Sequence, residues 1–154
     1  RYQGIDLLID SFALALPEMP RASLVIVGGS EQDIRAYRGK VQKLSLEKNI
    51  FLPGPRPVEE LGVLLAEADV LVSPRISGDN TPMKIYSYLH AGKPLVVTDL
   101  PTHTQVLNSS VAFLGGTTPP ACGWTPLVSP SGYYGSHFAG QFSEISVCVT
   151  PIRK

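Results

Sequence analysis

"DVLVSPRISGDNTPMKIYSYLHAGKPLVVTD", residues 69–99, contains the pattern of a strand, a helix and a second strand. The runs "DVLVSP" (69–74) and "PLVVTD" (94–99) are short and almost wholly apolar, which is typical of strands buried on both faces of a parallel sheet. Between them "PMKIYSYLHAG" (82–92) predicts a helix, since proline suits its first position and Gly92 its C-cap. The stretch therefore predicts one β-α-β unit.

The same alternation continues on both sides of this unit. Ser30, three residues before Asp33, predicts a reciprocal cap at the start of one further helix. Helices are expected at 5–16, 30–46, 57–68 and 101–107, and strands at 23–29, 49–54 and 111–114. This order predicts an α/β fold, a Rossmann-like parallel sheet with helices on both faces. Such sheets bind ligands at the carboxyl ends of their strands.

The composition changes after Gly115, so we expect one domain at 1–115 and an atypical, irregular tail at 116–154. The tail carries three charged residues, and its glycines and prolines follow no period. It is either a flexible tail or a sequence that does not continue the domain naturally, as after a frame shift; we favour the second. We expect the leading strand of the domain to be missing, which leaves its neighbours open, and a short strand around 144–149 to pair with an edge exposed in this way. Truncation after Leu114 is then expected to cost little stability.

Charge and hydropathy exclude several function classes. Thirteen basic residues balance thirteen acidic ones, which gives no field that would attract nucleic acid. No apolar run approaches the roughly 20 residues of a membrane span. The chain starts without Met or a signal peptide pattern, which suggests a piece of a longer protein. The two cysteines form no metal-binding pattern.

The loop before the predicted helix at residue 82 is the candidate site. With Asn80 or Thr81 as the cap, the backbone N–H groups of 80–84, the helix dipole and the Lys84 ammonium converge on one point. This arrangement predicts an anion site, best suited to phosphate. The alternative is a surface lysine beside an ordinary loop.

Four segments together resemble a known family. "YQGIDLLIDSFA", "LVIVGG", "NIFLPG…PVEELGVLLAEADVLVSP" and "NTPMKIYSYLHAGKPLVVTD" are similar to the C-terminal donor domain of "group 1" retaining GT-B glycosyltransferases. The resemblance covers residues 2–114 in the family's order. It implies one half of a GT-B fold that binds a UDP-, GDP- or ADP-linked sugar for glycan biosynthesis, with no cofactor. It also implies a hexosyltransferase-like enzyme, inactive without an N-terminal acceptor domain that this chain lacks.

The resemblance assigns the diphosphate to one group of residues. The helix start at Pro82, with Asn80, Thr81 and Lys84, would receive the diphosphate. The absence of an Asp-x-Asp motif fits neutralisation by Lys and dipole, with no metal. In the segment matching "YQG", Gln3 and Gly4 stand where the family usually places a diphosphate-binding Lys.

The resemblance also assigns the base, the sugar and the ribose. Arg56 lies in the "GPRP" loop (54–57), which matches the base-reading segment. The family's two glutamates have seven residues between them. They correspond to Asp79, the catalytic candidate that touches the sugar, and Ser87, the ribose anchor. Ser87 replaces a carboxylate by a hydroxyl, so weaker nucleotide binding is expected.

Two other functions are compatible with an α/β domain of this order. The losses at Gln3 and Ser87 favour a non-catalytic GT-B-like domain that binds nucleotide or scaffolds a partner. A flavodoxin-like module lacks support, because no acidic cluster or flavin phosphate loop follows the first strand. His103 is a further candidate for a polar role in the ligand cleft. The expected location is the cytoplasm, with membrane association through the missing part.

Overall fold

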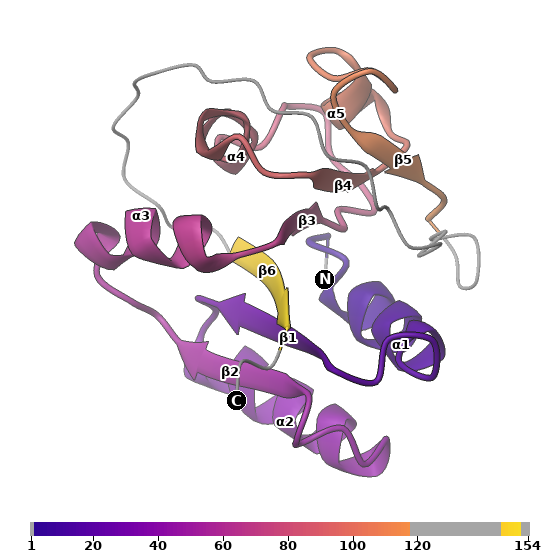
Figure 1. The fold of residues 1–154 in the computed structure, drawn as a ribbon, viewed down its shortest axis with the longest axis vertical. Coiled ribbons are helices and arrows are strands. Elements are labelled where there is room, and N and C mark those ends of the chain that lie inside the picture. The colour runs from indigo at the N-terminus through magenta and orange to yellow at the C-terminus, as the bar shows by residue number, and fades with distance from the viewer. Residues whose placement is uncertain (1, 118–145, 152–154) are drawn as a thin grey trace.

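The computed structural model describes residues 2–117 and the backbone of residues 146–151. Strands and helices alternate along the chain (Figure 1). The strands are β1 (Ala22–Val27), β2 (Ile50–Gly54), β3 (Val70–Ser73), β4 (Leu95–Thr98), β5 (Phe113–Gly115) and β6 (Ser146–Pro151). The helices are α1 (Ile5–Ala15), α2 (Glu31–Lys43), α3 (Val58–Glu67), α4 (Lys84–Ala91) and α5 (Pro101–Thr104). The predicted fold class and the order of elements are confirmed.

The strands form one sheet in the order β2-β1-β6-β3-β4-β5. Strand β1 runs parallel to β2, β3 to β4, and β4 to β5. Strand β6 is antiparallel to both β1 and β3, so β1 and β3 point the same way. The carboxyl ends of strands β1 to β5 therefore meet at one edge of the sheet.

Strand β6 bears on two expectations about the end of the chain. The predicted short strand exists, and it pairs with β1 on one side and β3 on the other, so it lies at the centre of the sheet (Figure 1). This position opposes the expectation that truncation after Leu114 costs little stability. The proposed foreign origin of the tail rests mostly on residues 118–145, which lie outside the described part. The domain boundary at 115 stays a prediction.

Helices cover both faces of the sheet, as the apolar strands predict. Neighbouring residues of a strand face opposite sides. Val72 accordingly packs with α1 and α2 around Phe12, whereas Leu71 packs with α3 and α4 around Tyr88. Helices α1 and α2 lie on one side of the sheet and α3 and α4 on the other (Figure 1). The two cores hold the strand ends in fixed positions at the carboxyl edge.

One end of α2 and one end of α4 have the capping residues that the sequence predicts. Ser30 accepts a hydrogen bond from the Asp33 backbone N–H at 3.2 Å, and the Asp33 carboxylate accepts one from the Ser30 backbone N–H, also at 3.2 Å. The reciprocal cap predicted for α2 is thereby confirmed. Gly92 ends α4 in the left-handed conformation, with φ 62°, as predicted.

Candidate functional site

The candidate site lies where the loops after β2 and β3 leave the sheet. The Gly28 backbone N–H donates to the Gly54 carbonyl at 3.0 Å, which holds the loops after β1 and β2 side by side. The chain after β3 covers a longer path, residues 74–83, before α4 begins. Parallel strands present such loops at one edge, which is where α/β sheets bind their ligands.

The segment before α1 packs directly onto the loop after β3. The Ile76 backbone N–H donates to the Tyr2 carbonyl at 3.0 Å. Gly4 has φ 68°, and a Cβ at this position would stand 1.8 Å from the Pro74 carbonyl oxygen. The backbone contact is so close that only glycine fits. This contact brings the predicted residues Gln3 and Gly4 to the carboxyl edge.

Lys84 and Gln3 meet in the protein interior. The Lys84 ammonium donates to Gln3 Oε1 at 3.4 Å, and Lys84 is 0% exposed. Residues 81 positions apart in sequence, both named by the sequence analysis, are thus in contact. A buried ammonium acts more strongly on an approaching anion than a solvated one, because the local dielectric is lower. The ammonium is covered in this structure, so a phosphate reaches it only after the groups around it move.

The start of α4 differs from the prediction. The helix begins at Lys84, after Met83, and no side chain caps it. A tighter turn precedes it, in which the backbone N–H groups of Ile85 and Tyr86 donate to the carbonyls of Pro82 and Met83. The expected cap residues have other partners. The Thr81 hydroxyl accepts a hydrogen bond from the Gln105 amide, and the Asn80 carbonyl accepts one from Arg75.

The remaining predicted site residues lie at the surface near this edge. Asp79 and Arg56 are exposed, in the loops after β3 and β2, and Ser87 is half-buried on α4. Within the described residues, no hydrogen bond or ion pair joins any of these three side chains to Lys84 or Gln3. Their roles in binding or catalysis stay predictions.

His103 is buried behind the loop and does not line an open cleft. Its Nδ1 lies 2.8 Å from the Thr98 carbonyl, and its Nε2 lies 3.0 Å from Ser73 Oγ. A carbonyl accepts only, so Nδ1 carries the proton and Nε2 accepts from the serine hydroxyl. Burial lowers the pKa of His103; the bond to Thr98 opposes this, and the charges of Lys84 and Arg75 add to it. His103 therefore stays neutral and joins the ends of β3 and β4.

Arg75 is a residue of this site that the sequence analysis missed. Its guanidinium donates to two carbonyls of its own loop, Ser77 at 2.8 Å and Asn80 at 2.7 Å. It also lies over the Tyr2 ring, 5.2 Å from the centroid. The available signal was its place directly after an apolar strand, three residues before Gly78.

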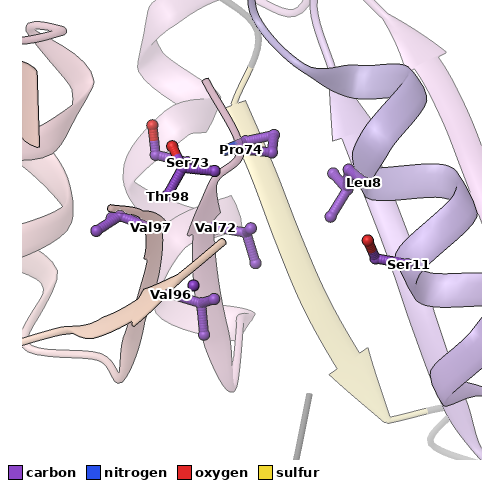
Figure 2. A pocket seen from close by; sticks show the side chains of 9 residues that line it. Leu8, Ser11, Val72, Ser73, Pro74, Val96, Val97 and Thr98 are labelled. Carbon is purple, nitrogen blue, oxygen red and sulfur yellow. The ribbon is translucent and has the colours of Figure 1, made fainter. Parts of the chain in front are cut away.

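A small cavity lies beside the site, between α1 and the ends of β3 and β4 (Figure 2). Its volume is about 20 Å³, and most of its lining is apolar. Ser11 borders it, and its buried hydroxyl has no hydrogen-bond partner in the described structure. Pockets for small ligands measure roughly 300–1,000 Å³, so this cavity has room for about one water and not for a nucleotide.

The described residues also show what kinds of metal site and membrane span they contain. Among the described residues, no group of three or more His, Cys, Asp or Glu side chains is arranged to hold a metal ion. No helix in that part of the chain has the length and apolarity needed to cross a bilayer.

The solved structures that share this fold include three of HepE from Anabaena. The complex of HepE with UDP has a TM-score of 0.65 and 24% identity and covers 79% of this chain. The complex with UDP and glucose has a TM-score of 0.64, 22% identity and 75% coverage. The complex with UDP-glucose has a TM-score of 0.63 and 24% identity and covers 79% of this chain. The match spans 33%, 31% and 33% of the respective HepE chains, about one third of their length. No curated protein sequence matches this chain.

The family follows from the sequence itself. The family described as "Glycosyl transferases group 1" matches residues 1–118, which is more than half of the chain. The matched region includes β1 to β5, α1 to α5 and both loops of the candidate site. This chain therefore belongs to the group 1 glycosyl transferases.

Proposed function

We propose that this chain is the donor-binding part of a retaining glycosyltransferase that uses a nucleotide-diphospho sugar. The observation that carries the proposal is the meeting of Lys84 and Gln3 at the carboxyl edge, within the part of the chain that matches the family. A cation held there in a low-dielectric setting attracts a diphosphate. In this proposal the loop of residues 54–57 contacts the nucleotide base through its backbone groups and through Arg56.

The nucleotide to test first is UDP, because the three similar structures are of a protein solved with UDP or UDP-glucose. GDP and ADP are the alternatives. In the proposed arrangement Lys84 compensates the diphosphate charge, Asp79 approaches the transferred sugar, and the hydroxyl of Ser87 contacts the ribose. The acceptor, and the alignment that retention requires, would come from a further domain.

Titration calorimetry of the full chain with UDP, and with uridine as a control, tests the diphosphate site. Lys84→Met removes the charge and keeps most of the side-chain length. A lost charge-assisted hydrogen bond of about 1.5–3 kcal/mol corresponds to a loss of roughly tenfold or more in UDP affinity. Uridine affinity should be unchanged. Equal UDP affinity in both proteins would show that Lys84 does not bind the diphosphate.

The ribose position has its own test. Ser87→Glu restores a carboxylate where the family usually has one, and should tighten UDP binding by about 1 kcal/mol, roughly fivefold. Ser87→Gln is the matched control, because it has the same length without the charge. Unchanged or weaker binding in a folded Ser87→Glu protein means that the ribose lies elsewhere.

The second candidate is a non-catalytic nucleotide-binding or scaffold domain. The observation in its favour is that the neutral side chain of Gln3 contacts Lys84 from the position where the family usually has a cation. Both candidates bind nucleotide, so sugar transfer by the longer protein distinguishes them. The cytoplasmic location stays a prediction.

A further inference from the structure

The loop after β3 is folded around its own arginine. Arg75 Nε and Nη1 donate to the carbonyls of Ser77 and Asn80, so one rigid side chain spans most of the loop. Gly78, at φ 126°, leaves the space that the guanidinium occupies, since a Cβ there would lie 2.5 Å from Arg75 Nη2. The loop conformation therefore depends on the forked shape of the guanidinium.

The backbone of Arg75 is anchored from the protein interior. The Thr98 hydroxyl donates to the Arg75 carbonyl, and His103 Nδ1 lies 3.2 Å from that hydroxyl and 2.8 Å from the Thr98 carbonyl. His103 is 0% exposed and Thr98 is 3% exposed, so water does not compete for these bonds. A polar relay thus runs from α5, through the end of β4, to the first residue of the loop.

The same arginine reaches the segment before α1. Its guanidinium stacks on Tyr2, and the next residue, Ile76, donates its backbone N–H to the Tyr2 carbonyl. Tyr2 precedes Gln3, which contacts Lys84. Arg75 consequently links the two segments that form the candidate site.

We propose that Arg75 is a positioning residue of the donor site, held in place by His103 through Thr98. The proposal rests on the proposed function, because it assumes that the loop of residues 75–81 meets the nucleotide sugar. Two of the guanidinium donors are already used by loop carbonyls, so its role is to set the loop and not to supply charge. Lysine carries the same charge but lacks the fork, and it should fail as a substitute.

Arg75→Lys and Arg75→Ala should weaken UDP binding to a similar extent, about thirtyfold, since each lost bond to the loop is worth roughly 1 kcal/mol and two are lost. Hydrogen exchange of the backbone amides at 76–80 should rise in both variants. The positioning role would be overturned if Arg75→Lys bound UDP as tightly as the wild type while Arg75→Ala bound it more weakly, because affinity would then depend on the charge alone.

The histidine gives a matched pair of variants. Asparagine can place an amide N–H near the position of Nδ1, whereas glutamine extends to the position of Nε2 and misses Thr98. UDP affinity should stay within about threefold of wild type in His103→Asn and fall about tenfold in His103→Gln. Leu107→Ala removes a buried side chain on the same segment without touching the relay, so it should lower the melting temperature and leave UDP affinity unchanged.

The readouts separate this inference from the proposed function. A wild-type chain that binds no UDP refutes the proposed function, and the donor-site role of Arg75 fails with it. If UDP binds but exchange at 76–80 is the same in Arg75→Lys and wild type, the inference fails while the proposed function stands. Equal loss of affinity in His103→Asn, His103→Gln and Leu107→Ala would reduce His103 to a purely structural residue.

Discussion

Gly4 sits where two backbone segments approach most closely at the candidate site. A Cβ at Gly4 would overlap the Pro74 carbonyl, and φ 68° is unfavourable for other residues. Gly4→Ala should therefore destabilise the protein by about 2–4 kcal/mol and displace the loop after β3. Urea unfolding measures the change.

Gly62 provides the control for this substitution. It lies inside α3, and a Cβ there would meet no atom within 4 Å. Gly62→Ala should stabilise the protein by about 0.5–1 kcal/mol, because alanine loses less entropy in a helix. A similar loss of stability in both variants would mean that the contact with Pro74 is not the cause.

His103 makes the stability depend on pH. Its pKa is lowered from 6.5 by burial and by the charges of Lys84 and Arg75. Between the folded pKa and 6.5 the unfolded chain binds more protons at His103 than the folded one does. The contribution of His103 to stability therefore falls as the pH drops below about 6.5 and does not change above it. In His103→Asn this part of the slope should disappear. Urea unfolding at about pH 5 and about pH 8 tests it, and an equal slope in both proteins would contradict the prediction.

The role of a residue was predictable only where its hydrogen-bond partner is close in the sequence, or where the family resemblance assigns a role to that residue. Gln3 and Lys84 were both named by the sequence analysis, and the structure brings them together. Arg75 was missed because its partners depend on the path of the folded loop. His103 was only a candidate for a polar role in the cleft, and its burial depends on packing between α5 and the sheet, which no local pattern encodes.

Among the elements, α2 depends most clearly on a local signal. Ser30 and Asp33 cap each other, and the bond to Ser30 lowers the pKa of Asp33. Ser30→Ala should cost about 1 kcal/mol, as for other N-cap serines, and should expose the first turn of α2. Ser30→Asp keeps an acceptor at the cap and is the control. Hydrogen exchange at 31–35 measures the fraying; unchanged protection in Ser30→Ala would refute the role of the cap.

The start of α4 shows the limit of prediction at this scale. Pro82 and Thr81 gave a clear sequence signal for a helix start, yet α4 begins at Lys84. The Thr81 hydroxyl accepts a bond from Gln105, and the turn at 82–86 is closed by bonds between residues three apart. A partner 24 positions away thus competes with the local cap. Periodicity and capping rules cannot predict the first residue of a helix when it depends on a contact with a residue far away in the sequence.

At the scale of the whole molecule, β6 is the strand that joins two half-sheets. On one side lie β2 and β1, and on the other β3, β4 and β5. A chain ending at Thr117 should lose cooperative unfolding, because both neighbours of β6 would lose their hydrogen-bonded partner. Thermal unfolding followed by circular dichroism checks this. A single transition at the wild-type temperature would restore the original expectation that the tail is dispensable.

The fold class was predictable because five apolar strands alternate with helices, and that pattern leaves few alternatives. For β6, pairing with strands left open was expected, but its antiparallel direction was not predicted, since the sequence of 144–149 does not specify a direction. Alternation of side chains predicts a strand and leaves its neighbours and direction open.

Strand β6 also has a consequence for how quickly the protein folds. Residue 149 pairs with residue 24, and 125 positions separate them. Such distant contacts slow folding, because a long loop must close before they stabilise the chain. During synthesis β1 and β3 emerge long before β6 and present unpaired backbone groups until it arrives. Refolding should accordingly be limited by closure of the sheet centre, and the nascent chain should be most prone to aggregation in that interval.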